Sequence, residues 1–462
     1  MLPQTTLPAA EILRRNSHAF SSHSYSALLS AIGPAKVVLI GDSTHGTHDF
    51  YAHRANLTER LIEEKGFLAV ALEADWPDAA CANRWVNGLD SQKMDPLREF
   101  QRFPKWMWKN TVMPPFLRWL REHNATKRPE QKVGIYGMDL YSLHRSAAAV
   151  VEFLKKVDPC AAHRAKEKYN CFDRFGEDTT SYAWANMLGI NVSCEKEVLE
   201  VLRDLAAATT APLAASAINE DSRFEAEMNA LTVRDAEKYY RTMMREDEKS
   251  WNIRDEHFVM VLQKMAEHLQ RKGQEAKIVV WAHNSHIGDA RATDMGKRRG
   301  EVNVGQLCRQ VFGEENVFNV GFLGSKGTVT AADAWDEPAR VFELRPPIPG
   351  SLERLLGENM LNHNLLITHR LVQHLNDPKP TKVPVDKDLV NLLNQPRYQR
   401  FVGVLYKPLT ERQSHYSICE TARQYDAIVH LANTSAIKPL EPEDKEHEWK
   451  VGDPDETFPF GL

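Results

Sequence analysis

Cysteine is scarce in this sequence. The chain of 462 residues has only six, which are dispersed and form no C-x-x-C pair: Cys81, Cys160, Cys171, Cys194, Cys308 and Cys419. They are too sparse for the disulfide scaffold of a small secreted domain. The first residues also lack a charged stretch followed by an apolar run, so no secretory signal is visible. These features predict a cytoplasmic protein.

Long apolar runs and an excess of one charge are also missing. No stretch approaches the roughly 18–20 apolar residues that a membrane span needs. The 58 basic and 63 acidic residues leave a formal net charge of −5, which gives no reason to expect nucleic acid or an anionic membrane as a partner. With 42% hydrophobic and 26% charged residues, the composition is that of a soluble globular protein.

The motifs of nucleotide-binding and serine-nucleophile enzymes are absent. Neither a P-loop nor a G-x-G-x-x-G segment occurs, so the sequence indicates no nucleotide, and we expect no cofactor. No G-x-S-x-G elbow occurs either, because Ser43 lies in G-D-S-T-H, which lacks the second glycine. A nucleophilic serine is therefore not favoured.

Short apolar runs separated by helical patterns predict the fold class. The clearest runs, which read as buried strands, lie at 37–40, 67–72, 132–136 and 277–281. Further strands are expected at 317–322, 341–344, 400–406 and 427–431. This alternation predicts an α/β protein with a mostly parallel central sheet flanked by helices.

Between the third and fourth strands, the sequence shows almost no strand signal over residues 144–272. We therefore expect a large all-helical insertion that forms a second lobe over the active-site cleft. The expected division is a first part of the α/β core at 1–143, the helical lobe at 144–272, and a second part of the core with a C-terminal tail at 273–462.

Polar side chains gather where the predicted strands end. The first strand runs into Gly41–Arg54, which reads G-D-S-T-H-G-T-H-D-F-Y-A-H-R. Ligands bind at the carboxyl ends of parallel strands, so these residues should converge on one edge. They are Asp42 and His45 after the first strand, Glu73 after the second, Asp139 and Tyr141 after the third, and His283 and His286 after the fourth.

One arginine stands on an otherwise apolar helix face. The helix expected at about 49–64 has an inward stripe of Phe50, Arg54, Leu57 and Leu61. Such an arginine needs a partner or points into a polar site, although a stem that only snorkels at the rim is an alternative. Strands at 37–40 and 67–72 should be parallel and adjacent. Glu73 is then the expected partner of Arg54 or of an imidazole.

This set of residue types suits general acid–base hydrolysis. A base takes a proton from water, and cations or imidazoles stabilise the oxyanion. The competing interpretation is a metal-assisted hydrolase or a lyase or isomerase, because His45-x-x-His48 and His283-x-x-His286 have a spacing that metal ligands use. This signal is weak in a chain with 18 histidines. A third possibility is a relative that binds a small molecule without turning it over.

The same residues resemble the erythromycin esterase family. The similarity runs from about residue 37 to the C-terminus, and its segments occur in the family's order. They are Gly41–Thr47, Glu73–Pro77, Tyr136–Leu140, Trp251–Asp255, Trp281–His286, Thr410–Tyr416 and Pro454–Pro459.

The resemblance implies a hydrolase that opens a lactone or ester, since characterised members open the macrolactone ring of erythromycin-like antibiotics without a required metal. It implies an α/β core with a helical lobe and substrate in the cleft between them. His45 would be the general base and Glu73 would orient it or the water. The residues that would polarise the carbonyl or protonate the leaving alkoxide are Arg54, His283 and His286.

The expected partner is a small-molecule ester or lactone. The residues expected to bind it are Asp42, Asp139, Trp76, Arg254 and His415, which lie in these segments, and Tyr141, which directly follows one of them. His48 falls outside the first signature and is expected to cap the helix or lie at the rim. The sequence departs from the family at Asp42, where the usual residue is glutamate, so the carboxylate is shorter by one methylene.

Overall fold

A nine-stranded sheet runs through the centre of the molecule. The computed structural model describes residues 7–21, 25–175, 179–190, 193–210, 219–360, 362–374, 377 and 379–440. The strand order is β1-β8-β13-β6-β2-β5-β3-β4, with β7 paired to β6. The strands are β1 (Ser17–Ala19), β2 (Val37–Ile40), β3 (Ala69–Asp75), β4 (Gly134–Asp139), β5 (Ile278–Trp281), β6 (Val317–Ala331), β7 (Arg340–Glu343), β8 (Asn364–Ile367) and β13 (Ala427–Thr434).

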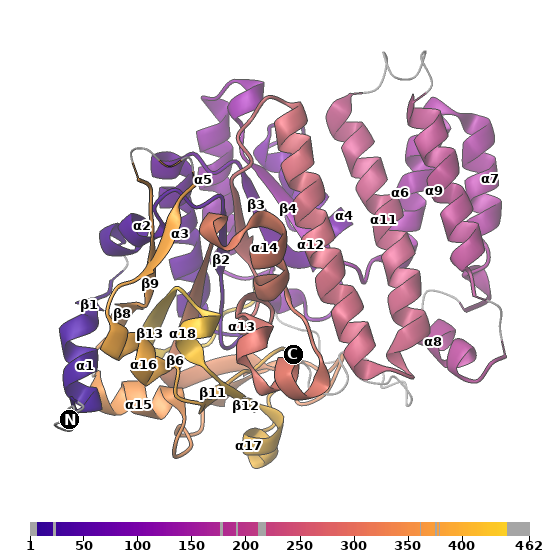
Figure 1. The fold of residues 1–462 in the computed structure, drawn as a ribbon. Coiled ribbons are helices and arrows are strands. Elements are labelled where there is room, and N and C mark those ends of the chain that lie inside the picture. Colours follow the sequence, from indigo (N-terminus) through magenta and orange to yellow (C-terminus); the bar gives the residue numbers. More distant parts are fainter. Residues whose placement is uncertain are drawn as a thin grey trace.

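The strands from β13 to β4 pair in parallel. Three pairs are antiparallel: β8 with β13, β1 with β8, and β7 with β6. Helices flank the sheet, and a group of helices stands beside it (Figure 1). The prediction of a mostly parallel α/β sheet with a large helical insertion is therefore confirmed.

The prediction that the strands at 37–40 and 67–72, now β2 and β3, are adjacent is wrong. β5 lies between β2 and β3 and pairs in parallel with both. The chain passes through the whole helical insertion before it returns as β5, so adjacency in sequence did not give adjacency in the sheet. As a result, the segment that follows β5 lies between the segment that follows β2, which carries His45, and the end of β3, which carries Glu73.

Alternating strand residues bury the two faces of the sheet against different helices. Val38 and Ile40 face one core, and Val37 and Leu39 face the other, as expected for a strand whose successive side chains point to opposite faces. The first core includes α2 (Ser26–Ile32), α3 (His48–Lys65), α4 (Trp76–Val86) and α5 (Met113–Ala125). The second includes α1 (Ala9–Asn16), α12 (Asp247–Arg271), α14 (Val304–Phe312), α15 (Leu352–Asn359) and α16 (Lys387–Leu393).

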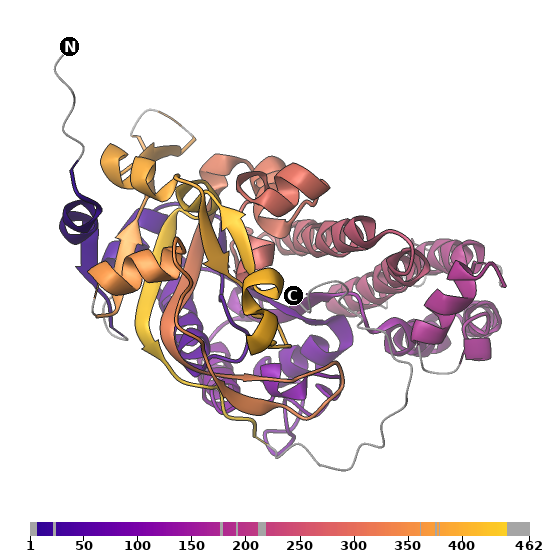
Figure 2. The same ribbon diagram turned by 90° about the horizontal axis from the view of Figure 1, so that it is seen from below.

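The helical insertion has a core of its own. Its helices are α6 (Leu143–Val157), α7 (Pro159–Tyr169), α8 (Thr179–Met187), α9 (Glu195–Thr210) and α11 (Glu220–Met243). α11 connects this core to the sheet, because Ala226 and Val233 pack inside the lobe while Phe224 and Met228 pack on the sheet side. Figure 2 shows the lobe extending to one side of the sheet.

Most of the expected strands are present, but several extend further than predicted: β3 to Asp75, β4 to Asp139, β6 to Ala331 and β13 to Thr434. Gly66 follows α3 in the left-handed conformation (φ 70°) that suits the end of a helix. The strand expected at 400–406 is wrong in extent, because β11 (Arg397–Arg400) ends where that segment begins and pairs only with β12 (Tyr416–Cys419). The sequence predicted no strand for the hairpin of β9 (His369–Val372) and β10 (Thr381–Pro384).

A disulfide joins Cys171 and Cys194 inside the helical lobe, with their Cα atoms 6.0 Å apart. It connects the segment after α7 to the residue before α9. The sequence did not predict this bond, because 23 positions separate the two cysteines and pairing cannot be deduced from spacing alone. The other cysteines, Cys81, Cys160, Cys308 and Cys419, are free thiols.

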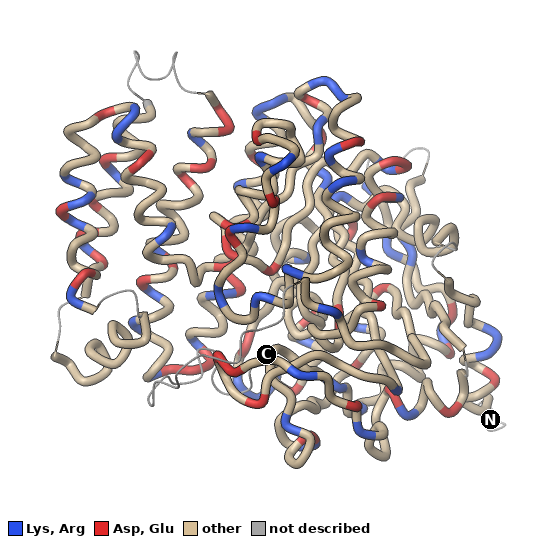
Figure 3. Tube along the Cα trace, turned by 180° about the vertical axis from the view of Figure 1, so that it is seen from behind, with Lys and Arg blue, Asp and Glu red and all other residues tan. Residues whose placement is uncertain are grey.

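Charges of both signs alternate along the surface of the molecule. Figure 3 shows basic and acidic residues interspersed on the helices of the lobe and around the sheet, as the similar totals of 58 and 63 would suggest. Among the residues that the structure describes, no helix has the length and apolar character to cross a bilayer.

A buried hydrogen bond fixes the last residue of β5 and gives a first prediction. The indole Nε1 of Trp281 donates to Thr58 Oγ1 on α3 (2.9 Å), and both side chains are fully buried. Thr58→Val keeps the shape but leaves the indole N–H unpaired. We expect the free energy of unfolding to fall by about 1–3 kcal/mol in a urea or thermal denaturation. Thr58→Ser keeps the acceptor and should lose less; equal losses would contradict this account.

Candidate active site

A tight turn carries His45 from the end of β2 to the start of α3. A Cβ on Gly41 would lie 1.9 Å from Asn284 Oδ1, and a Cβ on Gly46 would lie 1.7 Å from the Thr330 carbonyl oxygen. Only glycine fits at Gly46, because the clash there is with the backbone of β6. At Gly41 a larger residue would have to displace side chains of α13 (Asn284–Ile287). The two glycines therefore hold His45 in a fixed place at the carboxyl edge of the sheet.

Two carboxylates flank the His45 ring. Nδ1 lies 3.4 Å from Asp42 Oδ1, and Nε2 lies 3.7 Å from Glu73 Oε1. The side chain is almost fully buried, with only its edge on the cleft. An imidazole with a carboxylate at each nitrogen can take up a proton and remain stabilised as a cation.

Arg54 pairs with Asp42. Of the two partners expected for Glu73, Arg54 or an imidazole, the structure shows imidazoles, those of His45 and His286. Arg54 Nη1 lies 2.7 Å from Asp42 Oδ2, and its Nη2 donates to the Ala282 carbonyl oxygen (2.6 Å). Burial would raise the pKa of Asp42, but Arg54 and then His45 outweigh it and hold that pKa below its usual range. The shorter carboxylate therefore still reaches both groups. Arg54 is fully buried behind it and does not line the cleft.

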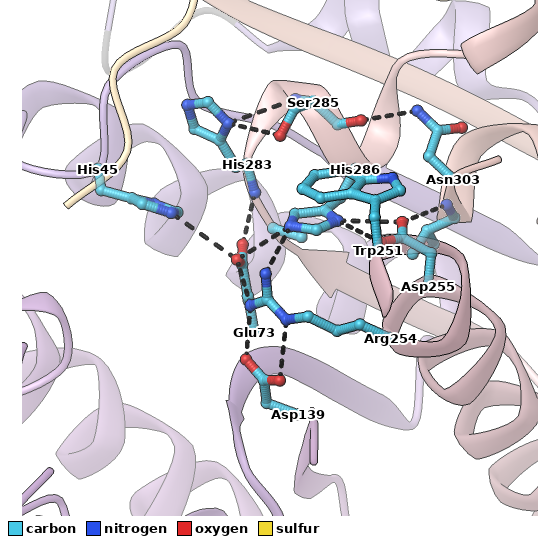
Figure 4. Close-up of polar contacts among 12 residues, drawn as sticks. His45, Glu73, Asp139, Trp251, Arg254, Asp255, His283, Ser285, His286 and Asn303 are labelled. Carbon is cyan, nitrogen blue, oxygen red and sulfur yellow. Dashed lines mark hydrogen bonds and ion pairs between the residues drawn. The ribbon is translucent and has the colours of Figure 1, made fainter. Parts of the chain in front are cut away.

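Glu73 stands at the end of β3 among cations and N–H groups. Oε1 lies 3.1 Å from Arg254 Nη2 and 3.3 Å from His286 Nε2, and Oε2 accepts from the backbone N–H of His283 (2.7 Å). Burial would raise the pKa of Glu73, but His286, His45 and Arg254 together hold it well below its usual range. Glu73 is therefore an anion. Figure 4 shows it at the centre of the group.

His286 lies behind Glu73 and is charged. Its Nδ1 is 2.9 Å from Asp255 Oδ2, and its Nε2 faces Glu73. Burial would lower the pKa of His286, but Asp255 and Glu73 outweigh it and raise that pKa to about 9. The indole of Trp251 stacks on the ring at 4.6 Å (Figure 4).

His283 differs from His286 although both follow β5. Burial lowers the pKa of His283 to about 3, and the neighbouring His45 adds to the shift. The ring is therefore neutral at physiological pH. Its Nδ1 lies 2.8 Å from Ser285 Oγ, and its centroid lies 4.7 Å from that of His45. His283 can accept or donate a single hydrogen bond beside the base.

A cleft opens in front of His45 and Glu73. One wall is polar and consists of Asp75, Asp78, Arg102, Asp139, Tyr141 and Arg254. The other wall is largely apolar and consists of Phe100, Phe103, Pro104, Met107, Trp108, Trp335 and Val404. Lys105 and Ala74 also line it. Pockets of this composition bind small molecules.

Stacked cations organise the polar wall. The guanidinium of Arg102 lies 4.3 Å from the centroid of the Tyr141 ring, and that of Arg254 lies 5.0 Å from it. Arg254 also makes two hydrogen bonds to Asp139 (3.0 and 2.7 Å). Arg254 therefore lines the cleft and contacts Glu73, whereas Arg54, which the sequence predicted to polarise the carbonyl, does not line the cleft.

Two further carboxyls on this wall retain protons readily. Burial raises the pKa of Asp78 to about 8, and Asp75 adds to the shift while Arg145 opposes it. Burial also raises the pKa of Asp75, against the attraction of Arg102 at 3.1 Å. Neither carboxyl was predicted, although Asp75 lies two residues after Glu73 on the same strand and so points to the same side.

Most of the predicted site residues lie together, but some do not line the cleft. The cleft is lined by His45, Glu73, Asp139, Tyr141 and Arg254. Trp76 packs against Tyr136 and Phe224 in the core. His415 accepts from the Lys407 backbone N–H (3.0 Å) and contacts the Phe401 carbonyl oxygen (3.2 Å), within its own loop. The segment Pro454–Pro459 lies outside the described residues.

Residues for which the sequence predicted no role in the site complete it. The wall residues Phe100, Phe103 and Trp335 lie outside regular structure, so no periodic pattern marked them. Trp251 and Asp255 stand one turn apart on α12, and this spacing places both on one face of the helix. The sequence did not show which residues that face contacts. Among the described residues, no group of three His, Cys, Asp or Glu side chains is placed to hold a metal ion.

Curated proteins with similar sequences include esterases. Erythromycin esterase type II of Escherichia coli is 26% identical over 167 residues, which cover 35% of this chain and 38% of that protein, about two fifths of its length. The putative hydrolase YbfO of Bacillus subtilis (strain 168) is 24% identical over 337 residues, which cover 70% of this chain and 71% of that protein.

The fold also matches solved structures. A mutant erythromycin esterase in its open conformation superposes with a TM-score of 0.63 at 16% identity, covering 91% of this chain and 96% of that one. At this identity the likeness shows the fold alone. The family model for erythromycin esterase matches residues 62–434, a range that begins after the His45 turn and includes Glu73, Asp139, Arg254 and both histidines that follow β5. The chain therefore belongs to the erythromycin esterase family.

Proposed function

We propose that the protein hydrolyses a carboxylic ester or lactone with water that His45 activates. The observation that carries this proposal is the position of His45 on the cleft, between Asp42 and the anionic Glu73. Family membership supports a hydrolase of esters in general.

The reaction begins with water at the cleft face of His45. Asp42 faces Nδ1 and favours the tautomer with a hydrogen there, which leaves Nε2 free to take a proton from water. The hydroxide attacks the carbonyl carbon while the imidazolium forms beside Glu73. This carboxylate stabilises the new positive charge, as an acid beside a catalytic histidine does in other hydrolases.

The tetrahedral intermediate needs a positive partner for its oxygen. Arg254 lines the cleft and is fixed by Asp139 and Glu73, so its guanidinium needs no rearrangement to meet the oxyanion. The intermediate then expels the alkoxide, and the proton on His45 Nε2 passes to it. The products are a carboxylic acid and an alcohol, which remain one molecule when the substrate is a lactone.

Macrolide-like macrolactones are the substrates to test first. Relatives of this chain carry the name erythromycin esterase, and the cleft pairs an apolar wall with a wall of carboxylates and cations. A molecule with an apolar face and a hydroxylated face fits both. We propose a small ester or lactone of this amphipathic kind as the substrate.

The decisive variant is His45→Asn. Loss of the general base should lower kcat by about 10²–10⁴-fold against any ester that the parent hydrolyses. Incubation with a panel of macrolides, lactones and esters, followed by mass spectrometry for the addition of one water, measures it. His48→Asn is the matched control, since His48 starts α3 and does not line the cleft. Full activity in the His45 variant contradicts the proposal, and a parent without activity on the whole panel favours a binding protein.

The apolar wall gives a second prediction. Trp335 faces Phe103 across a centroid distance of 4.9 Å and lines the cleft. In Trp335→Ala, KM for a bulky ester should rise about tenfold, roughly 1.4 kcal/mol, while KM for a small acetate ester stays near its parent value. Trp184→Ala, on the partly exposed surface of α8, serves as the control. Equal changes for both esters would show that the wall does not select substrates.

A further inference from the structure

A buried carboxylate stands next to the cleft residue Arg254 in the chain but does not itself line the cleft. It is that of Asp255 on α12, which is fully buried. Both of its oxygens contact His286 Nδ1 (3.0 and 2.9 Å), and Oδ1 also accepts from the backbone N–H of Val304 (2.9 Å). A carboxylate so placed accepts hydrogen bonds, so Nδ1 of His286 carries a hydrogen.

The other side of the same ring holds Glu73. His286 Nε2 lies 3.3 Å from Glu73 Oε1, and Glu73 Oε1 lies 3.7 Å from His45 Nε2. The contacts thus run from Asp255 through His286 and Glu73 to His45 (Figure 4). The charges of Asp255, His286 and Glu73 alternate in sign along this series, which is the arrangement that makes buried charges tolerable.

The surroundings of His286 favour a charged ring. The ionisable groups that face it are Asp255 and Arg254 from α12, Glu73 from β3, and the neutral His283 from α13. Arg254 opposes that charge, because its Nη1 lies 3.2 Å from His286 Nε2. Both groups also contact Glu73 Oε1, so this one carboxylate offsets the repulsion between two neighbouring cations. Trp251, one turn before Asp255, covers the ring with an interplanar angle of 4°, and an aromatic face stabilises a cation.

We propose that Asp255 is a positioning residue for the hydrolysis. It holds His286 in its charged form, whose Nε2–H orients Glu73 toward His45. Without Asp255, His286 would become neutral, Glu73 would lose a hydrogen-bond donor, and the carboxylate beside the base would no longer be fixed. This inference rests on the proposed role of His45.

The charge on His286 should set the alkaline limit of the activity. The pKa of His286 is raised to about 9, chiefly because Asp255 and Glu73 outweigh burial. A raised pKa means that the charge contributes fully below the ordinary value near 6.5 and is lost as the pH rises through about 9. The kcat of the parent should therefore fall on the alkaline side near pH 9.

Asp255→Asn removes the charge and keeps the size of the side chain. We expect kcat to fall about 10–100-fold while KM stays within about twofold, which is the usual size of the effect when a residue that orients a catalytic group is lost. The alkaline limb of the kcat profile against pH should move toward neutral pH. Asp255→Glu should recover part of kcat and return the limb toward 9. Unchanged kcat and an unmoved limb in Asp255→Asn would overturn the proposal.

The chain contains a matched control, a second buried pair of aspartate and histidine, which joins α11 and α12. Asp235 on α11 lies 2.8 Å from Nδ1 of His257 on α12, and the histidine is buried. This pair does not line the cleft. Asp235→Asn should destabilise the fold to a similar degree and leave the kcat profile against pH unchanged. A shift of the limb in this variant as well would assign the effect to stability and overturn the proposal.

A measurement without substrate separates this inference from the proposed function. Nitrogen NMR of labelled histidine rings at pH 8, with the signal assigned by its loss in His286→Asn, should find His286 doubly protonated in the parent and in Asp235→Asn, and neutral in Asp255→Asn. A charged ring in Asp255→Asn overturns the inference even if esters are hydrolysed. If no ester is hydrolysed, the proposed function fails while the ring signals still decide what Asp255 does.

Should Asp255→Asn fail to fold by circular dichroism, Trp251→Leu tests the same point. It removes the stacked ring without removing an ionisable group. The alkaline limb should again move toward neutral pH, and an unmoved limb in a folded Trp251→Leu protein overturns the proposal.

Discussion

The organisation of the site depends on the burial of one negative charge. Glu73 lies at the end of β3, shielded from water, and an isolated carboxylate there would be very unfavourable. It is tolerated because an arginine from α12, an imidazolium from α13 and the N–H that follows β5 all point at it. Separate parts of the chain, joined by the helical insertion, must therefore come together before the site exists.

Much of this arrangement could be predicted from the order of apolar and polar residues in the sequence. Apolar runs that end in polar residues identified the edge where ligands bind, and the G-D-S-T-H-G turn identified His45. What the pattern could not supply was the order of the strands. Because β5 enters between β2 and β3, Arg54 meets Asp42 and the backbone of Ala282, while Glu73 meets groups from α12 and α13.

Other features escaped because they depend on long-range contacts. Trp76 and His415 lie in segments that resemble the family, yet one packs in the core and the other binds its own loop. The disulfide between Cys171 and Cys194 could not be predicted, because the spacing of cysteines in the sequence does not show which segments lie close together. Asp42 was the notable departure in the sequence, and its shorter side chain still contacts both His45 and Arg54.

The two walls of the cleft differ in how they are built. The charged groups stand on strand ends and on α12, where neighbouring pairs hold each of them. The apolar wall comes largely from irregular chain around Phe103 and Trp335. Loops tolerate substitution far better than buried ion pairs. Evolution can therefore reshape the binding surface of such a protein, and with it the range of molecules accepted, while the groups that perform the chemistry stay in place.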